Sequence, residues 1–379
     1  LNAGSSSVKF ALFRLAEEPE EVAHGQIEGL GGTPHFVAET PAGEQLVDRP
    51  LARDAAHGGA LRGLLGWFEE QFADVRVAAV GHRVVHGGPR FSKPTIIEPH
   101  VLDILEAYGS LAPLHQPHNL SGIRAAQEAF PDAVQVACFD TAFHREHPWV
   151  NDVYALPREF YDRGVRRYGF HGLSYAYIVH RLWEIAPELV RGNIVVAHLG
   201  SGASMCGIRH GRPVSSTLGF SALDGLPMGT RCGDLDPGVI LYLLQAEEMN
   251  AEQIQDLLYK KSGLLGLSGI SNDMRALEES DAPEAADAIE YFVYRIRREI
   301  GAMAAALGGL DGLVFTGGIG ENSRLVRRRV CHAMDFFGIG VDEAKNEANE
   351  QDIAADGARC RVMVVPTNEE AMIARATAS

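Results

Sequence analysis

Residues 1–10 read LNAGSSSVKF, and this stretch poses the first question about the fold. A glycine and three serines separate a short apolar start from a segment whose alternation favours a strand. Glycine and serine are ordinary residues of β-hairpin turns, so one interpretation is a plain turn. The other is a phosphate-binding loop, because glycine lets backbone N–H groups turn toward a ligand and serine adds hydroxyl donors. The segment alone leaves both interpretations open.

Two further glycine-rich loops are expected after apolar strands: AHLGSGAS at 197–204 and VFTGGIGEN at 314–322. Three such segments are less easily accidental than one. A P-loop is excluded because the dipeptide Gly-Lys is absent from the sequence. The third segment reads G-x-G-x-x-S from Gly318 to Ser323, which lacks the third glycine of a dinucleotide-binding fingerprint. A nucleotide site in this chain would therefore use another architecture.

Composition limits the classes of protein. The chain has 379 residues, 46% hydrophobic and 22% charged, as expected for a soluble globular protein with two domains. A formal charge of −16 argues against nucleic acid as a partner. We find neither an 18-residue apolar run nor a secretory signal pattern and expect no membrane span. The five widely spaced cysteines favour a reducing cytoplasm without disulfides or a zinc site.

Short apolar runs alternate with helical patterns along the chain, which predicts an α/β fold. The expected strands are residues 8–13, 77–85, 134–139, 194–198, 313–316 and 362–365. The expected helices are residues 59–72, 119–129, 175–186, 233–244 and 285–307. The last helix carries an apolar stripe, which favours a core position or a subunit contact over a ligand site. This stripe consists of Ile289, Phe292, Val293, Ile296, Ile300 and Met303.

Two charged residues lie at expected strand ends. In GHRVVHGG, alternation places Arg83 and Val85 on the face opposite His82, Val84 and His86. A guanidinium beside an apolar wall suits a small carboxylate with a short tail, and the alternative is a surface ion pair.

Asp140 follows the expected strand 134–139, at the tip where α/β folds usually place chemistry. A helix N-cap is the alternative for this residue.

Other candidates lie in loops. His171 stands between aromatic residues and glycine, and His115 lies in a proline-rich loop, so each is either a packed histidine or a site residue. Arg231 lies in a loop dense in Gly, Asp and Pro, where an arginine is more often a ligand contact. Glu369 and Glu370 follow a strand and would either hold Mg²⁺ or complement the dipole of a C-terminal helix.

Taken together in order and spacing, these segments resemble the acetate kinase family. They are LNAGSSSVKF, GHRVVHGG, PLHQPHN, FDTAFH, YGFHG, HLGSGAS, MGTRCGDLDPG, FTGGIGENS and PTNEE, from Leu1 to Glu370. The resemblance implies two ribonuclease-H-like domains, as in actin-like ATPases, with a nucleotide cleft between them. It implies an acyl- and phosphate-binding domain at 1–142, completed by about 370–379. The nucleotide-binding and homodimerisation domain would be residues 143–369.

The same resemblance implies an enzyme. It would transfer the γ-phosphoryl group of ATP to acetate, reversibly and in line, with Mg²⁺ or Mn²⁺, giving acetyl phosphate and ADP. Two alternatives stay open: a propionate or butyrate kinase of the same family, and a non-catalytic ATP-switch protein of the same superfamily. A carbohydrate kinase would need an aspartate base and a polar sugar pocket, and HRVVHGG offers an arginine and valines instead.

Catalytic roles follow from the resemblance residue by residue. Arg83 and Arg231 would bind the carboxylate and the transferred phosphoryl group. His171 would stabilise the phosphoryl oxygens in transit, with His115 nearby. The family role of Asp140 is acid/base catalysis. Because acetate is already ionised at pH 7, we favour Asp140 as a residue that orients the arginines and the metal's waters.

The resemblance also implies the binding residues. Asn2 and Glu369 would organise Mg²⁺, and Lys9 would reach the ATP phosphates. The acyl pocket would be formed, besides Arg83, by Val85, Leu114, Phe170 and Ala222. The nucleotide would be held by His198, Leu199, Gly200, Ser201, Gly202, Asp273, Met274, Arg275, Gly318, Ile319, Gly320, Glu321 and Asn322.

Four positions depart from the family pattern. Ser201 stands where the family usually has Asn, and Leu173 and Tyr175 stand where it has Thr and His. Ala222 replaces the usual Pro, which would enlarge the acyl pocket. A methylene in such a pocket is worth only ~1–3 kcal/mol, so propionate is expected as a further substrate beside acetate.

Overall fold

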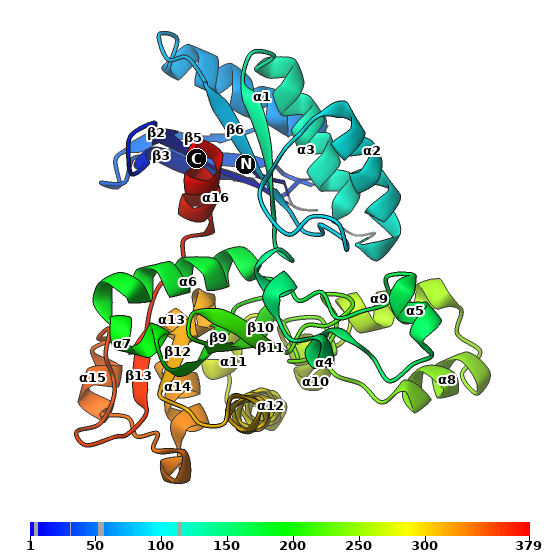
Figure 1. Cartoon of the computed structure of the whole chain (residues 1–379), viewed down its shortest axis with the longest axis vertical. Coiled ribbons are helices and arrows are strands. Elements are labelled where there is room, and N and C mark those ends of the chain that lie inside the picture. Colours follow the sequence, from blue (N-terminus) through cyan, green and yellow to red (C-terminus); the bar gives the residue numbers. More distant parts are fainter. Residues whose placement is uncertain (4–6, 31, 52–56, 113–114) are drawn as a thin grey trace. The chain divides into compact units, whose positions relative to one another are not determined.

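The computed structural model describes residues 1–3, 7–30, 32–51, 57–112 and 115–379, and the chain divides into two compact units. Unit 1 comprises Leu1–Arg145 and Asn368–Ser379, and unit 2 comprises Glu146–Thr367. Each unit combines strands and helices (Figure 1). No helix in the described part of the chain is both long enough and apolar enough to cross a membrane.

The strands of unit 1 form one antiparallel and one mixed sheet. The antiparallel sheet, in spatial order, consists of β1 (Asn2–Ala3), β2 (Ser7–Arg14), β3 (Glu20–Glu28), β4 (His35–Glu39) and β5 (Gln45–Pro50). The mixed sheet has the order β6 (Ala79–Val84), β8 (Val134–Phe139) and β7 (Thr95–Ile96), with β6 parallel to β8. A backbone hydrogen bond of 2.9 Å from Arg83 N to Leu1 O places β6 beside the start of β1. The resulting order is β3-β2-β1-β6-β8.

The helices of unit 1 are α1 (His57–Gln71), α2 (Pro99–Ala107), α3 (Gln116–Ala129) and α16 (Glu369–Ala378), with short 3₁₀ turns at Tyr108–Leu111 and Phe143–Glu146. Alternation along β6 decides which helix each face meets. Val84 packs in a core cluster with Leu120 and Ile123 of α3. The other face carries Gly81, where a Cβ would lie 2.4 Å from Ile373 of α16. Only glycine lets α16 pack this closely, on the face to which Arg83 also belongs.

Unit 2 contains one five-stranded sheet. Its order is β11 (Arg212–Ser216), β10 (Ala203–Arg209), β9 (Asn193–Leu199), β12 (Gly312–Thr316) and β13 (Arg361–Val364). β9, β12 and β13 are parallel, whereas β10 is antiparallel to both its neighbours. This order and these directions repeat β3-β2-β1-β6-β8 of unit 1, although the sequence shows no repeat of matching length.

The helices of unit 2 lie on both sides of this sheet (Figure 1). They are α4 (Trp149–Asp152), α5 (Arg158–Asp162), α6 (Gly172–Ile185), α7 (Pro187–Val190), α8 (Pro237–Gln245), α9 (Ala251–Lys260), α10 (Gly263–Ser268), α11 (Met274–Glu278), α12 (Pro283–Leu307), α13 (Gly317–Asn322), α14 (Arg324–Cys331) and α15 (Glu343–Glu347), with a 3₁₀ turn at Asp335–Phe337. α12 packs against β9, β10 and β11. Its apolar stripe from Ile289 to Met303 is buried, so this stripe belongs to the core of the unit rather than to a subunit contact.

The predicted strands are all present, and most boundaries agree within two residues. The predicted helix at 233–244 is wrong at its start, because α8 begins only at Pro237. The Asp236 side chain accepts a hydrogen bond from Gly238 N and caps the helix there, while Gly233 has a left-handed φ of 72°. The antiparallel strands β3, β4, β5, β10 and β11 were not predicted. β3, β4 and β5 are half-buried, and such strands give weak apolar signals, whereas β10 is almost fully buried.

Candidate active site

A charged cluster lies at the carboxyl ends of β6 and β8 in unit 1. Arg83 lies on β6 and Asp140 directly follows β8, and because these strands are parallel, their ends meet at one edge. The Arg83 guanidinium donates from Nε to Asp140 Oδ1 at 3.0 Å and from Nη2 to Oδ2 at 2.6 Å. This two-pronged geometry is the strong form of the arginine–carboxylate pair. Asp140 is 1% exposed, so the pair is buried on its acidic side.

Two further predicted residues join this cluster. Arg83 Nη1 donates to Asn2 Oδ1 at 3.3 Å, and Arg83 Nε lies 3.5 Å from Glu369 Oε2. Glu369 is the first residue of α16, whose N-cap is Asn368, so it lies in the first helical turn and also beside Arg83. The helix-dipole interpretation of this glutamate therefore holds, and its role in holding Mg²⁺ stays a prediction. Two carboxylates around one guanidinium give the cluster a formal charge of −1.

This negative charge affects the pKa values of Glu369 and Arg83. Burial raises the pKa of Glu369, Arg83 acts in the opposite direction, and the neighbouring Glu370 raises the pKa further. Burial also opposes the charge of Arg83, but Asp140 and Glu369 outweigh it and raise the pKa of the guanidinium. Buried oxygen donors with excess negative charge fit a hard cation such as Mg²⁺. Among the described residues no three His, Cys, Asp or Glu side chains form a closed metal site, so water or phosphate would complete the coordination.

Lys9 and Asn2 are direct cross-strand partners of the β1–β2 pair. Lys9 is exposed, on the face opposite the buried Val8 and Phe10, and its charge counteracts the raised pKa of Glu369. Residues 4–6, which connect the two strands, lie outside the described residues. The chain thus forms an antiparallel β1–β2 pair, and the phosphate-cradle interpretation of the opening segment stays a prediction.

The proline-rich segment of unit 1 contributes an unpredicted residue, Asn119. Its Oδ1 accepts from Val85 N at 3.0 Å and its Nδ2 donates to Ala3 O at 2.8 Å. This buried amide therefore joins the end of β1 to the segment after β6. The sequence feature that could have pointed to Asn119 is its position in the segment PLHQPHN. β6 ends at Val84, so the predicted alternation does not extend to Val85. His115 directly precedes α3, and Leu114 lies outside the described residues.

A second cluster, formed by histidines and hydroxyl groups, lies in unit 2. His171 precedes α6 in the left-handed region, with φ of 56°, which is a strained conformation for a residue other than glycine. Its Nδ1 lies 2.8 Å from Ser204 Oγ, and its ring stacks on His198 with centroids 4.3 Å apart. His198 Nδ1 is in turn 2.8 Å from Ser174 Oγ. Neither serine was predicted, because nothing in the sequence links β10 and α6.

Arg231 and His171 converge on Gly202. A Cβ at Gly202 would lie 3.4 Å from His171 Nε2 and 3.9 Å from Arg231 Nη1. Arg231 Nη1 also donates to Ala222 O at 2.9 Å. Gly263, with φ of +63°, supports this arrangement, because a Cβ there would lie 2.7 Å from Arg231 O. Phe170, next to His171, is 2% exposed and belongs to the same unit.

The predicted nucleotide-binding segments also come together in unit 2. Residues 200–202 form the turn between β9 and β10, where Gly200 N donates to Gly202 O. Gly229 N donates to Ser201 O at 3.1 Å, and a Cβ at Gly229 would touch Asn272, the neighbour of Asp273. A Cβ at Gly200 would lie 3.8 Å from Gly318 N. Three segments far apart in sequence therefore share one region.

The side chains of several of these residues are buried or already form hydrogen bonds or ion pairs within the chain. Such residues can offer mainly backbone groups to a nucleotide. The segment 318–322 is not a loop, since it forms most of α13. The Glu321 carboxylate accepts from Gly317 N at 2.8 Å and Thr367 N at 3.1 Å, which caps the helix internally. Asp273 pairs with Arg275 at 2.6 Å and caps α11. The side chains of Met274 and Leu199 are buried.

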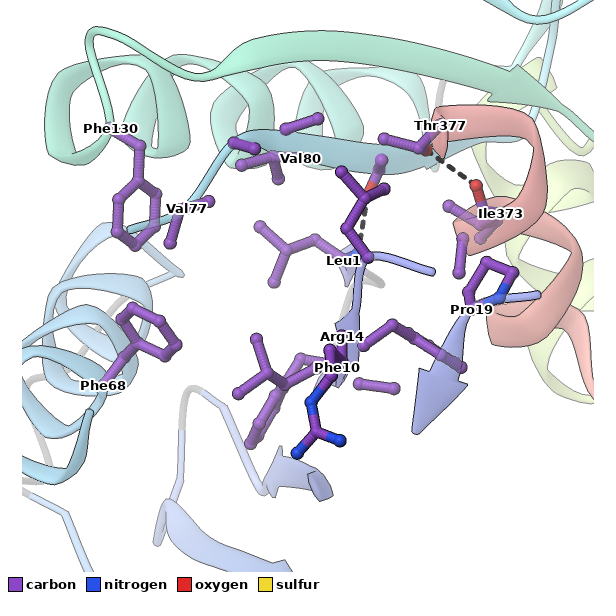
Figure 2. A pocket seen from close by; sticks show the side chains of 18 of the residues that line it. Leu1, Phe10, Arg14, Pro19, Phe68, Val77, Val80, Phe130, Ile373 and Thr377 are labelled. Atoms are coloured by element: carbon purple, nitrogen blue, oxygen red, sulfur yellow. Dashed lines mark hydrogen bonds between the residues drawn. The ribbon is translucent and has the colours of Figure 1, made fainter. Parts of the chain in front are cut away.

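A cavity of about 540 Å³ in unit 1 is separate from these clusters. It lies between β2 and the segment leading into β6, and Figure 2 shows apolar side chains such as Phe68, Val80, Phe130 and Ile373 around it. Among the described site candidates, Glu370 alone lines it, and most of the other lining side chains are apolar. Such a lining suits an apolar group better than a phosphate or carboxylate.

Known proteins resemble this chain over its whole length. It is 57% identical over 387 residues to an acetate kinase of Methylocella silvestris, covering 100% of this chain and 96% of that protein. It is 52% identical over 381 residues to an acetate kinase of Rhodopseudomonas palustris, covering 99% of this chain and 96% of that protein.

Solved structures agree. The crystal structure of Porphyromonas gingivalis acetate kinase has a TM-score of 0.89 at 40% identity, covering 100% of this chain and 97% of that chain. A propionate kinase from Francisella tularensis has a TM-score of 0.93 at 35% identity, with the same coverage. These likenesses confirm the predicted α/β fold of the actin-like ATPase type. The acetokinase family model matches residues 1–375, and the chain belongs to the acetokinase family.

Proposed function

We propose that this chain transfers the γ-phosphoryl group of ATP to acetate, giving ADP and acetyl phosphate, in a reversible Mg²⁺-dependent reaction. The observation that carries the proposal is the convergence of His171 Nε2 and Arg231 Nη1 beside Gly202. An imidazole, a guanidinium and a glycine backbone around one small space suit the oxygens of a transferring phosphoryl group. Phosphoryl transfer depends mainly on positioning and charge neutralisation, which these groups supply.

Unit 1 carries the residues that we assign to the acceptor. Arg83 binds the carboxylate of the acceptor, and Asp140 fixes the plane of its guanidinium through two hydrogen bonds. A residue engaged in this way is better suited to orient a cation than to accept a proton. Acetate is already ionised at neutral pH, so the reaction needs no general base.

The oxygens of Asn2 and Glu369 hold the metal in this proposal, partly through water. When bound, Mg²⁺ neutralises phosphate charge and aligns the phosphoryl group with its acceptor. Lys9 reaches the phosphates from the exposed face of β2. The β9–β10 turn, α13 and the start of α11 offer mainly backbone groups to ATP, because the side chains of Glu321 and Asp273 are engaged and that of Met274 is buried. The exposed hydroxyl of Ser201 is a further donor.

A propionate kinase is the second candidate, and a position in unit 2 favours it. Ala222 is half-buried and holds Arg231 through its carbonyl oxygen. Its methyl side chain is smaller than the proline ring that the family pattern usually has here. If Ala222 borders the acyl group, the extra space admits one more methylene, a difference of about 1–3 kcal/mol.

A homodimer is also part of the proposal, through a surface other than the predicted stripe of α12. The helix α8 buries none of its residues within the chain, yet its sequence is PGVILYLLQ. Leu241 and Tyr242 are 54% and 55% exposed. Such a contiguous apolar surface marks an interaction site, and we assign it to a second copy of the chain. Leu241→Glu should convert the dimer to a monomer in light scattering, whereas a wild-type monomer would contradict the assignment.

The test of the activity is Mg²⁺-dependent ADP formation from ATP with acetate, propionate or butyrate in parallel. Preference for acetate supports the main proposal, and preference for propionate keeps the mechanism but changes the substrate. ATP binding without turnover on any of the three acids would contradict both and favour a nucleotide switch.

A further inference from the structure

A buried tyrosine hydroxyl lies behind His171. Tyr175, on the first turn of α6, is 0% exposed, and its hydroxyl lies 2.5 Å from Ser204 Oγ. Ser204, also fully buried, lies on β10 and is 2.8 Å from His171 Nδ1. The three side chains therefore form a continuous chain of hydrogen bonds that ends at the imidazole. The opposite nitrogen, Nε2, is the one that faces Gly202 and Arg231.

When His171 is neutral and the Ser204 proton is donated within this chain of hydrogen bonds, two arrangements are possible. A serine hydroxyl has one proton, so it can donate to only one of its two neighbours. Either Tyr175 donates to Ser204 and Ser204 donates to Nδ1, or His171 donates from Nδ1 and Ser204 donates to the tyrosine. The first places the imidazole proton on Nε2, and the second leaves a lone pair on Nε2. The direction of these hydrogen bonds and the tautomer of the ring therefore determine each other.

We propose that Tyr175 is a positioning residue that, through Ser204, keeps the imidazole proton of His171 on Nε2. The inference rests on the proposed function, because the direction of these hydrogen bonds matters for catalysis only if His171 Nε2 donates to a phosphoryl oxygen. An Nε2 proton donates to an anionic phosphoryl oxygen, whereas an Nε2 lone pair would repel it. A phenol is also a better donor than acceptor, which favours the direction from tyrosine to serine.

The neighbouring ring is held in a similar way. His198 stacks on His171 at 4.3 Å, and its Nδ1 bonds to Ser174 Oγ, which lies 2.8 Å from Thr367 Oγ1. Two stacked imidazoles thus each have a hydroxyl at Nδ1. Tyr175 stands where the family pattern has histidine, so in this protein the group that bonds to Ser204 behind His171 is a phenol.

The first experiment compares Tyr175→Phe with Tyr177→Phe. The substitution at 175 removes only the donor, and Ser204 is then free to accept from His171. We expect kcat to fall about tenfold, less than the ~10²–10³ of a lost direct donor, with KM for acetate and ATP changed less than about twofold. Tyr177 is the matched control, since it lies two residues further on α6 and is only partly buried. Unchanged kcat in folded Tyr175→Phe would overturn the proposal.

The second experiment reads the proton directly and needs no turnover. In ¹⁵N-histidine-labelled protein, NMR should show a protonated Nε2 and an unprotonated Nδ1 for His171, assigned by signal loss in His171→Gln. Tyr175→Phe should increase the Nδ1–H form of His171. Ser204→Ala should have the same effect, and this variant replaces Tyr175→Phe in the experiment if the tyrosine variant does not fold. An Nδ1–H form in wild type would overturn the proposal. Because this readout is independent of catalysis, failure of the proposed function would be seen separately, as absence of phosphorylated product.

Discussion

The two units have the same order of strands but carry opposite chemistry at corresponding strand ends. The edge formed by β1, β6 and β8 in unit 1 carries Arg83, Asp140 and Glu369, two carboxylates around one cation. The edge formed by β9, β12 and β13 in unit 2 carries His198, with hydroxyl groups around it. The repeated topology therefore determines where a site forms, and the side chains determine which charge the site can take.

This difference has energetic consequences. The charged cluster of unit 1 is interdependent, because removing one member leaves a buried charge without its partner. The contacts described for the cluster of unit 2 are hydrogen bonds between imidazole and hydroxyl groups rather than ion pairs, so we expect changes to its members to cost less stability. The following predictions test this contrast, from the largest expected effect to the smallest.

Arg83→Ala should have the largest effect, on both activity and stability. It leaves Asp140 and Glu369 buried without their shared cation, so we expect the free energy of unfolding to fall by about 3–5 kcal/mol. Activity should fall by about 10³-fold or more. Urea unfolding and kcat/KM for acetate measure the two effects. Arg83→Lys is the control that keeps the charge but loses the two-pronged bond. An Arg83→Ala enzyme as stable as wild type would remove the contrast between the units.

Arg231→Ala should separate activity from stability. The side chain is partly buried and donates to the carbonyl of Ala222, a neutral group, so we expect its loss to cost less stability than the loss of Arg83. We expect kcat to fall by at least about 10²-fold, with the free energy of unfolding within about 1 kcal/mol of wild type. The same urea and kinetic measurements apply. Wild-type turnover in a folded variant would contradict the assignment of Arg231 as a residue that binds the phosphoryl group.

The sequence predicted the parts of the fold that depend on local patterns. The buried parallel strands were found because they are continuous apolar runs, and the position of Asp140 followed from the end of β8. The segment GGIGEN was predicted as a loop because three glycines disfavour helix. In the structure it is a helix, since Glu321 accepts from Gly317 N and from Thr367 N, 46 residues away. Tertiary contacts of this kind override propensity.

The support behind the site could not be predicted for the same reason. Ser174 and Thr367 meet across 193 residues, and Ser204 meets Tyr175 across 29. Serine and tyrosine in these segments give no periodic signal, and their pairing exists only once the strands have assembled. The predicted convergence of His171 and Arg231, in contrast, came from the resemblance to a family rather than from local pattern.

Mild acid should affect unit 1 before unit 2. Burial lowers the pKa of His82 to about 3, and burial with the charge of Arg145 does the same for His86. Between this value and the ordinary 6.5, the unfolded chain binds protons that the folded chain does not, so stability falls as pH falls. The raised pKa of Glu369 acts in the opposite direction. From about pH 7.5 to about pH 5, each of the two histidines should by itself lower the stability by about 2 kcal/mol.

Hydrogen exchange resolved by unit measures this loss. Amides of unit 1 should lose protection before those of unit 2 as the pH is lowered. His86→Asn is the matched variant, because its amide oxygen can accept from Gly88 N as His86 Nδ1 does, without a titrating group. It should reduce the pH dependence, and an unchanged dependence would show that His86 is not its source.

Gly202→Ala should have the smallest and most selective effect. The added methyl would lie in ordinary contact with His171 Nε2, at 3.4 Å, and near Arg231 Nη1, at 3.9 Å, so the fold has room for it. It would occupy the space that we assign to a phosphoryl oxygen, so kcat should fall about tenfold while thermal stability stays the same or rises slightly.

Gly318→Ala is the comparison, because a Cβ there meets nothing within 4 Å among the described residues. If ATP lies against α13, this second change should raise KM for ATP and leave kcat unaltered. Equal effects of the two substitutions on kcat would mean that the space beside His171 and Arg231 is not where the phosphoryl group passes.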